Sequence, residues 1–171
     1  MSFGKYTYGN PNIHFQSNNT KLVVGNFCSI GTNVNIYLGN GFGHDITFVS
    51  TYPFGYINQN IFPNIKNNST DTKGDVIIGN DVWIGNNVTI MSGVTIGDGA
   101  VISNNSHVVK NVEPYSLIGG NPAMLIKYRF TPQQIEKLLE IKWWCWDDNK
   151  INRFSPLLCN NDIDKFIKSA F

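Results

Sequence analysis

The sequence has few charged residues, a nearly balanced charge and no long apolar segment. Asp, Glu, Lys and Arg make up 15% of the 171 residues, and the formal net charge is +1. Such a chain lacks the basic surface typical of proteins that bind nucleic acid or anionic membranes. No apolar run approaches the roughly 20 residues needed to cross a bilayer, and the N-terminus has no pattern of a secretory leader. These absences predict a cytoplasmic protein with no membrane span and no nucleic-acid partner.

Cysteine number and spacing argue against two further classes of protein. Cys28, Cys145 and Cys159 are odd in number and far apart, so they predict neither a disulfide framework nor a metal site. No cluster of His, Cys and Asp has metal-ligand spacing, and no glycine-rich nucleotide-binding motif is present. Cys28 is interpreted as a small core residue, with a nucleophile as the alternative.

The main feature of the sequence is a run of consecutive six-residue repeats, or hexads. Between Ile78 and Val112, Ile or Val opens every hexad, a small or β-branched residue takes the fifth place, and Gly, Asn and Asp are frequent in the positions between. A helix would repeat near 3.6 residues and a half-buried strand near 2. A period of six instead fits a short strand followed by a tight corner, and three hexads would close one triangular coil. The alternative, an ordinary sheet, would have to match this frame by chance. The opening residues are Ile78, Ile84, Ile90, Ile96, Ile102 and Val108.

The repeat is interrupted once. Residues 24–39 form about one more coil, and residues 1–23, whose periodicity is weaker, are expected to cap the stack. From about 39 to 74 the frame is lost in a segment rich in Gly, Asn and aromatic residues. Because Ile36 and Ile78 are separated by a multiple of six, we expect this excursion to contain a coil plus an extruded loop. A long excursion of this kind is often functional, although a tolerated insertion is the alternative.

The last part of the chain changes character. Glycines and prolines from Pro114 onward mark the end of regular coiling. Thr131-Pro132-Gln133-Gln134 has the pattern of a capping box that opens a helix, and a second helix is expected from 162 to 170. The tryptophans near 143 are expected to pack this region on a neighbouring surface. The sequence therefore predicts a β-helix domain over 1–126 and a helical extension over 127–171.

Four sequence blocks resemble the hexapeptide-repeat xenobiotic acetyltransferases, a family that includes chloramphenicol and streptogramin acetyltransferases and sugar-modifying relatives. The blocks are Val24-Gly-Asn-Phe-Cys-Ser-Ile-Gly, Lys73-Gly-Asp-Val-Ile-Ile-Gly-Asn-Asp-Val-Trp-Ile-Gly, Gly119-Gly-Asn-Pro-Ala-Met-Leu-Ile-Lys-Tyr-Arg-Phe and Leu139-Glu-Ile-Lys-Trp-Trp. The resemblance implies an all-β fold, a left-handed parallel β-helix of hexapeptide repeats with an extruded loop and C-terminal α-helices.

The same resemblance implies an active-site histidine. The family carries its general base on the excursion loop, and the matching residue here is His44 in Gly41-Phe-Gly-His-Asp. Imidazole suits this role because it can accept the proton of an attacking hydroxyl near neutral pH. The simpler alternative is a histidine hydrogen-bonded within a loop. His14 and His107 are interpreted as structural or surface residues.

Acetyl-CoA is the acyl donor that the resemblance implies, bound in a groove between two subunits of a homotrimer, with no metal. Trp83, Gly85 and Ser103 are expected to line the groove, and Lys127 and Arg129 to meet the CoA phosphates. Each also has an ordinary structural explanation: a large exterior side chain, a corner glycine, or a solvated basic pair before a helix.

The acceptor is predicted only by class. Tyr37, Tyr52, Phe54 and Tyr56 could form an aromatic acceptor pocket, which suits a sugar ring or a lipophilic antibiotic equally. The segment from Val49 to Phe54 resembles sugar-acetylating relatives more than antibiotic-modifying ones. We therefore expect acetyl transfer to a hydroxyl or amine of a sugar, such as a nucleotide-linked amino sugar or a polysaccharide precursor. The alternatives are an antibiotic O-acetyltransferase and a non-catalytic β-helix scaffold.

Overall fold

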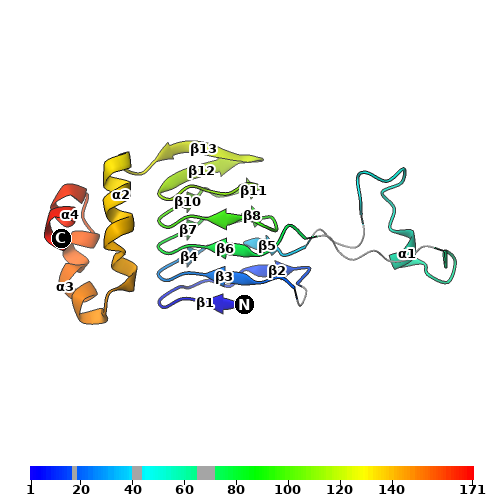
Figure 1. Cartoon of the computed structure of the whole chain (residues 1–171), viewed down its shortest axis with the longest axis horizontal. Helices are drawn as coiled ribbons and strands as arrows, with labels where there is room; N and C mark the ends of the chain where they lie inside the picture. The colour runs from blue at the N-terminus through cyan, green and yellow to red at the C-terminus, as the bar shows by residue number, and fades with distance from the viewer. Residues whose placement is uncertain (17–18, 40–43, 65–71) are drawn as a thin grey trace.

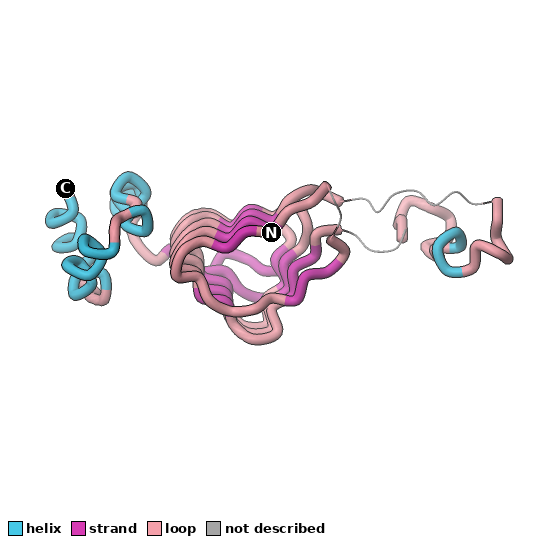
Figure 2. Tube along the Cα trace, turned by 90° about the horizontal axis from the view of Figure 1, so that it is seen from below, coloured by secondary structure: helices cyan, strands magenta, loops and turns pink. Residues whose placement is uncertain are grey.

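The computed structural model describes residues 1–16, 19–39, 44–64 and 72–171, which form a three-sided stack of parallel coils (Figures 1 and 2). Helices lie beside one corner of the stack, and the excursion leaves from the opposite side. In the described residues the first face contains β1 (Ser2–Phe3), β3 (Leu22–Val24), β6 (Val76–Ile78) and β9 (Thr95–Ile96). The second face contains β4 (Ser29–Ile30), β7 (Trp83–Ile84), β10 (Val101–Ile102), β12 (Ser116–Gly120) and β13 (Ala123–Tyr128). The third face contains β2 (Asn12–His14), β5 (Asn35–Tyr37), β8 (Thr89–Ile90) and β11 (His107–Val108).

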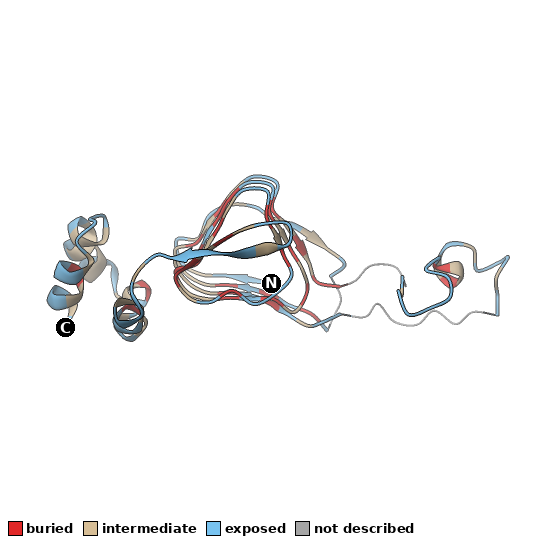
Figure 3. Cartoon of the chain, turned by 90° about the horizontal axis from the view of Figure 1, so that it is seen from above, coloured by how far each residue is buried: buried red, intermediate tan, exposed pale blue. Residues whose placement is uncertain are grey.

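The core is a column of aliphatic side chains inside the coils, as the repeat predicts. Figure 3 shows the positions of the buried residues along the coils. On the second face, Ile30 aligns with Ile84 and Ile84 with Ile102, and all three are buried. The residue next to each of them in the strand points outward, because side chains alternate along a strand. Burial of each such side chain stabilises the fold by about 1.5–3 kcal/mol, which explains why the hexads predict the core so well.

Corners join the strands through residues in the left-handed conformation. The fourth place of the hexad has positive φ at Asn33, Asp81, Asn87, Gly93, Gly99 and Asn105. Asparagine, aspartate and glycine tolerate this conformation better than other residues. The preceding corner residue links neighbouring coils: Asn86 Oδ1 accepts from the Thr32 N–H at 2.8 Å, and Asn104 Oδ1 accepts from the Asn86 N–H at 2.7 Å. The abundance of asparagine therefore serves both backbone geometry and hydrogen bonding between coils.

The excursion contains no coil, contrary to the expectation from the sequence. Equivalent corner residues of most successive coils are 18 positions apart, but across the excursion they are 54 apart, a difference of 36. β6 nevertheless pairs directly with β3, with Val76 opposite Leu22. The frame of six is therefore preserved by the length of the insertion and not by an added layer. The described residues 44–64, including α1 (Phe54–Ile57), project away from the coils (Figure 1).

The N-terminal residues form a more regular layer than their sequence predicts. β1 pairs in parallel with β3, β2 pairs with β5, and Tyr8 forms an isolated bridge to Ser29. This layer covers one end of the stack, as expected. Its periodicity is weak because one side of it has no neighbouring coil, so Phe3 and Tyr8 remain exposed.

At the other end the last coil continues into β12, which pairs with β10, and the chain then reverses into the antiparallel β13. The domain boundary expected at 126/127 falls inside β13. The predicted capping box is confirmed at α2 (Pro132–Ile141), where Thr131 Oγ1 accepts from the Gln134 N–H and Gln134 Oε1 accepts from the Thr131 N–H. α4 (Ile163–Ala170) is also confirmed.

A further helix, α3 (Asp148–Leu158), follows the 3₁₀ turn Trp143–Cys145 and was not predicted. Pro156 lies inside this helix and lacks the N–H that would bond to the Asn152 carbonyl. The Ser155 hydroxyl donates to that carbonyl at 2.8 Å instead, which helps the helix to tolerate the proline. None of the helices in the described part of the chain has the length and hydropathy of a membrane span.

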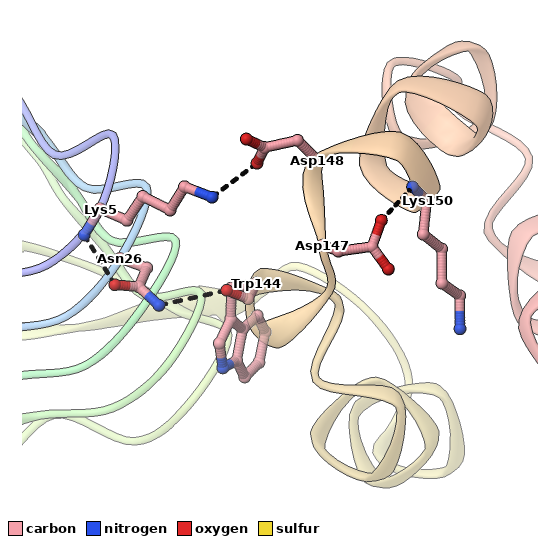
Figure 4. A network of polar contacts seen from close by, with 6 residues as sticks. All are labelled: Lys5, Asn26, Trp144, Asp147, Asp148 and Lys150. Carbon is pink, nitrogen blue, oxygen red and sulfur yellow. Dashed lines mark hydrogen bonds and ion pairs between the residues drawn. The ribbon is translucent and has the colours of Figure 1, made fainter.

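The helices are attached to the first coils of the stack (Figure 4). Lys5 Nζ lies 2.6 Å from Asp148 Oδ1, and Asn26 Nδ2 donates to the Trp144 carbonyl at 3.1 Å. Phe27 packs on Trp143 with ring centroids 4.8 Å apart. The tryptophans thus pack the extension against the coils, as expected from the sequence.

The buried position of Cys28 predicts unequal thiol reactivity. Cys28 is fully buried and its Sγ lies 3.1 Å from the Gly79 carbonyl oxygen, whereas Cys145 and Cys159 are exposed. Burial raises the pKa of the Cys28 thiol, which lowers its thiolate fraction. With a thiol reagent at pH 8, two thiols should react quickly and the third at least about 100-fold more slowly, until guanidinium unfolds the chain. Cys28→Ala should remove only the slow phase; three equally fast thiols would contradict this packing.

Candidate active site

His44 has the hydrogen-bonding arrangement of a proton acceptor. Its Nδ1 lies 2.9 Å from the Thr51 carbonyl oxygen, and His44 is exposed. A carbonyl can only accept, so Nδ1 carries the proton in the neutral imidazole and Nε2 keeps its lone pair. The neighbouring Asp45 carboxylate instead accepts from the Thr47 N–H and hydroxyl, which lowers the pKa of Asp45. The loop therefore orients the imidazole through a main-chain group.

Three of the four predicted acceptor-binding aromatics lie on the excursion with His44. Tyr52 and Phe54 meet edge to face at 4.7 Å, and Phe54 and Phe62 do so at 4.9 Å. The Asn58 amide donates to the Tyr52 hydroxyl at 3.4 Å, and Tyr56 is half-buried. This cluster gives the excursion a small aromatic centre of its own.

Tyr37 lies elsewhere, on the outer side of the third face. Its ring stacks on His14 at 4.5 Å with an interplanar angle of 19°. His14 also hydrogen-bonds through Nε2 to Asn35 Oδ1 at 2.8 Å, consistent with the structural role expected for it. Figure 1 shows α1 well separated from β5, so Tyr37 and the excursion cluster do not form one pocket within a single chain.

Trp83, Gly85 and Ser103 are brought together on the second face. They line a surface groove of about 260 Å³ with Val101, Asn104 and Leu117. Trp83 is 58% exposed, which is unusual for a tryptophan without a partner surface. Gly85 also has a packing role, because a Cβ there would lie 2.3 Å from Asn104 Oδ1 of the next coil.

The two predicted phosphate ligands have different surroundings. Lys127 is exposed on β13 opposite Leu117, a groove residue, and has no ion pair among the described residues. Arg129 points to a corner of the stack, where Nη1 donates to the Gly99 carbonyl at 2.6 Å and lies 3.6 Å from Asp81 Oδ2. Its guanidinium also lies over the Tyr115 ring at 5.4 Å. Arg129 therefore already has protein partners, and Lys127 is the more available cation.

The sequence analysis did not predict these contacts of Arg129 with Asp81, Gly99 and Tyr115. Burial raises the pKa of Asp81, while the Arg129 charge beside it acts in the opposite direction. Tyr115 is buried, and burial raises its pKa; its hydroxyl has no hydrogen-bond partner within the described residues. The available signal was Asp81 itself, a carboxylate at the fourth hexad place, where the equivalent corner of the adjacent coils holds Phe27 and Gly99.

The excursion, to which His44 belongs, projects beyond the coils (Figure 2), whereas the groove is formed by residues of the second face. Among the described residues, no group of three His, Cys, Asp or Glu side chains could hold a metal ion. The arrangement thus offers an oriented imidazole on one segment and a narrow groove on another.

Comparison with known proteins gives three kinds of match. Residues 75–110 match the family model described as bacterial transferase hexapeptide, six repeats. The chain is 43% identical to a chloramphenicol acetyltransferase of Klebsiella aerogenes, over 84% of this chain and 68% of that protein. It is 47% identical to a probable macrolide acetyltransferase of Lysinibacillus sphaericus, over 84% and 80% of the two chains. It is 44% identical to a virginiamycin A acetyltransferase of Staphylococcus aureus, over 88% and 68%.

Solved structures match less closely. A maltose O-acetyltransferase from Clostridium difficile 630 is 30% identical with a TM-score of 0.54, covering 75% of this chain and 59% of that one. A hexapeptide-repeat acetyltransferase from Vibrio cholerae, complexed with acetyl coenzyme A, is 27% identical with a TM-score of 0.56, covering 75% and 60%. The chain spans about 60% of the length of these solved structures.

Replacing Arg129 should destabilise the fold in a pH-dependent way. Arg129→Met leaves Asp81 half-buried without its cation, and we expect the free energy of unfolding at pH 7 to fall by about 1–3 kcal/mol. The pKa of Asp81 is raised in the folded protein above the ordinary 3.8 and would rise further without Arg129. The folded variant then binds a proton at Asp81 more readily than the unfolded chain does. The loss in the free energy of unfolding should therefore shrink as the pH falls from 7 toward the raised pKa of Asp81.

Urea unfolding at pH 7 and pH 5 measures this difference. Asp81→Asn combined with Arg129→Met should recover most of the loss, because asparagine removes the half-buried charge and tolerates the positive φ of this position. Lys127→Met, on the exposed strand, should change stability by less than about 0.5 kcal/mol. A loss in Arg129→Met that is equal at both pH values would contradict a role for the Asp81 charge.

Proposed function

The chain belongs to the hexapeptide-repeat acetyltransferases and is an acyltransferase, and from this we propose that it transfers an acetyl group from acetyl-CoA to a hydroxyl group, with His44 as the general base. The left-handed winding of the coils is part of the same proposal. Relatives of this identity are named as enzymes, which argues against the non-catalytic scaffold. The observation that carries the proposal is the His44 Nδ1 contact with the Thr51 carbonyl.

Acetyl-CoA is the proposed donor. The Vibrio cholerae neighbour was solved with acetyl coenzyme A, and a galactoside acetyltransferase, 26% identical with a TM-score of 0.54, was solved with coenzyme A. The surface groove of Trp83, Gly85 and Ser103 is the proposed site of the pantetheine arm, and Lys127, which lies opposite the groove residue Leu117, is the proposed partner of a CoA phosphate. Arg129 is a weaker candidate for a phosphate because of its internal contacts.

The proposed reaction is a direct transfer. The acceptor hydroxyl donates its proton to His44 Nε2 while its oxygen attacks the carbonyl carbon of the thioester. This attack forms the new C–O bond and gives a tetrahedral intermediate. Collapse of the intermediate breaks the C–S bond, and the imidazolium returns its proton to the departing CoA thiolate. The Thr51 carbonyl stabilises the imidazolium through the Nδ1–H bond. An amine acceptor would need this base less, because a neutral amine is already a nucleophile.

A sugar hydroxyl is the acceptor that we propose first. Aromatic faces such as Tyr52 and Phe54 stack on sugar rings, and the maltose and galactoside acetyltransferases are structural neighbours. The second candidate is an antibiotic hydroxyl of the chloramphenicol or streptogramin type. It is favoured by the names of the curated relatives, which are 38–47% identical over most of the chain.

A homotrimer with sites between subunits is also proposed. In one chain the excursion with His44 projects away from the coils, while the groove lies on the second face. A neighbouring subunit would bring one excursion alongside the groove of the next chain. Closed rings of this kind form from head-to-tail interfaces.

Removal of the imidazole should abolish most of the turnover. We expect His44→Ala to lower kcat/KM for a hydroxyl acceptor by about 10²–10⁴, measured as CoA thiol release from acetyl-CoA. Maltose, galactosides, chloramphenicol and virginiamycin A serve as the acceptor panel. His107→Ala, a histidine on a coil strand, is the matched control and should keep wild-type activity. Full activity in His44→Ala with a hydroxyl acceptor would refute the base assignment.

The shared site can be tested by complementation. Light scattering should give a mass three times the 19.2 kDa of one chain. Ser103→Tyr should block the groove and His44→Ala should remove the base, so each variant alone is inactive. Co-expression of the two variants should restore activity in mixed trimers, because some sites then pair an intact groove with an intact histidine. A monomeric mass, or no recovery in mixed trimers, would contradict the shared site.

A further inference from the structure

The outer side of the third face carries a second ordered histidine. β2 and β5 pair in parallel with His14 opposite Tyr37 and Asn12 opposite Asn35. Because Ile36 is fully buried in the core, its neighbours Asn35 and Tyr37 point outward, and their partners on β2 do the same. His14 and Tyr37 are both half-buried on this outer surface.

An amide fixes the plane of the His14 ring. Asn35 Nδ2 donates to the Asn33 carbonyl at 3.1 Å, which determines the orientation of the Asn35 amide. Asn35 Oδ1 then accepts from His14 Nε2 at 2.8 Å and from Asn12 Nδ2 at 3.3 Å. The neutral His14 ring therefore carries its proton on Nε2, and its orientation is set by two strands rather than by a loop.

The fixed ring supports Tyr37. The His14 and Tyr37 rings stack at 4.5 Å, and Phe15 approaches Tyr37 at 5.8 Å and His14 at 6.4 Å. Together these three side chains form an outer aromatic patch, His14–Phe15–Tyr37. Each ring pair of this type restricts the rotamers of both members.

The patch lies at the root of the excursion. The chain leaves the coil just after Tyr37, and it returns at Thr72, whose hydroxyl donates to the Leu38 carbonyl at 2.7 Å. Gly39 is packed against Phe15: a Cβ there would lie 3.2 Å from the Phe15 carbonyl oxygen. His44 follows Gly39 by five positions, which an extended chain spans in at most about 18 Å.

We propose that His14 is a positioning residue for the acceptor: it holds the Tyr37 ring in place as one wall of the acceptor site beside the excursion. The inference rests on the proposed function and on the prediction from the sequence that Tyr37 lines the acceptor site. The occupant is the ring of a hydroxylated acceptor, stacked on or against Tyr37. His14 acts through the tyrosine and takes no part in proton transfer.

Two substitutions separate this role from a general effect on folding. His14→Ala removes the stacking partner, and we expect the KM for the acceptor to rise about 3- to 10-fold with the KM for acetyl-CoA within twofold of wild type. His14→Phe keeps a flat ring and should return the acceptor KM to within about twofold of wild type. His107→Ala is the matched control on the same face, three strands along from β2, and should change neither constant. The probe is maltose or chloramphenicol, whichever the wild type acetylates.

The outcomes distinguish the inference from the function on which it rests. If Tyr37→Ala raises the acceptor KM and His14→Ala does not, the positioning role is wrong and the acceptor site stands. If neither variant changes it, Tyr37 lies outside the acceptor site and both assignments fail. Crystal structures of the two His14 variants give a readout that does not depend on turnover. Tyr37 should change rotamer or lose order in His14→Ala and keep its position in His14→Phe; an unchanged Tyr37 in His14→Ala would overturn the proposal.

Discussion

Every coil of this protein must lie in register with the coils above and below it, and the rest of the structure depends on that constraint. A single coil has too little apolar surface to be stable, so the aliphatic column is continuous only when equivalent corners coincide. The corner amides enforce this alignment, since Asn86 accepts from one neighbouring coil while its own N–H is bound by Asn104 of the other. The positive φ at the following residue turns the chain at the same height in each layer.

The outward side chains do not contribute to the core of the stack, and their chemical character differs from one face to the next. The second face presents Trp83 and a groove, while the third face presents amides, an imidazole and aromatic rings. One corner is occupied by the helices, through Arg129 at Asp81 and Trp143 on Phe27, and the excursion leaves from the other side. The groove and the surface that holds the helices therefore use different residues.

The sequence predicts the features that depend on local periodicity. It does not predict the features that depend on contacts between residues far apart in the chain. The isoleucines at the start of each hexad and the capping box at Thr131 predict core and helix directly, because both are fixed by spacing of three to six residues. The expected coil in the excursion was wrong, since a length that is a multiple of six says nothing about strand pairing. α3 was hidden by Pro156, and the internal contacts of Arg129 depend on a corner 30 residues away. Trp83, Gly85 and Ser103 line one groove because they lie on adjacent coils of the same face, and their role toward CoA stays a prediction. The role of His44 stays a prediction that rests on its loop geometry.

The pairing of β3 with β6 has a consequence for how such proteins diversify. The excursion begins and ends at adjacent points, with Thr72 bonded to Leu38, so the stack is continuous whether the intervening chain is long or short. Closing a longer loop costs only about 0.6 kcal/mol for each doubling of its length. The segment that bears His44 and its aromatic residues can therefore change in length and sequence while the stack stays the same, and under the proposed function such changes would alter the acceptor without rebuilding the scaffold.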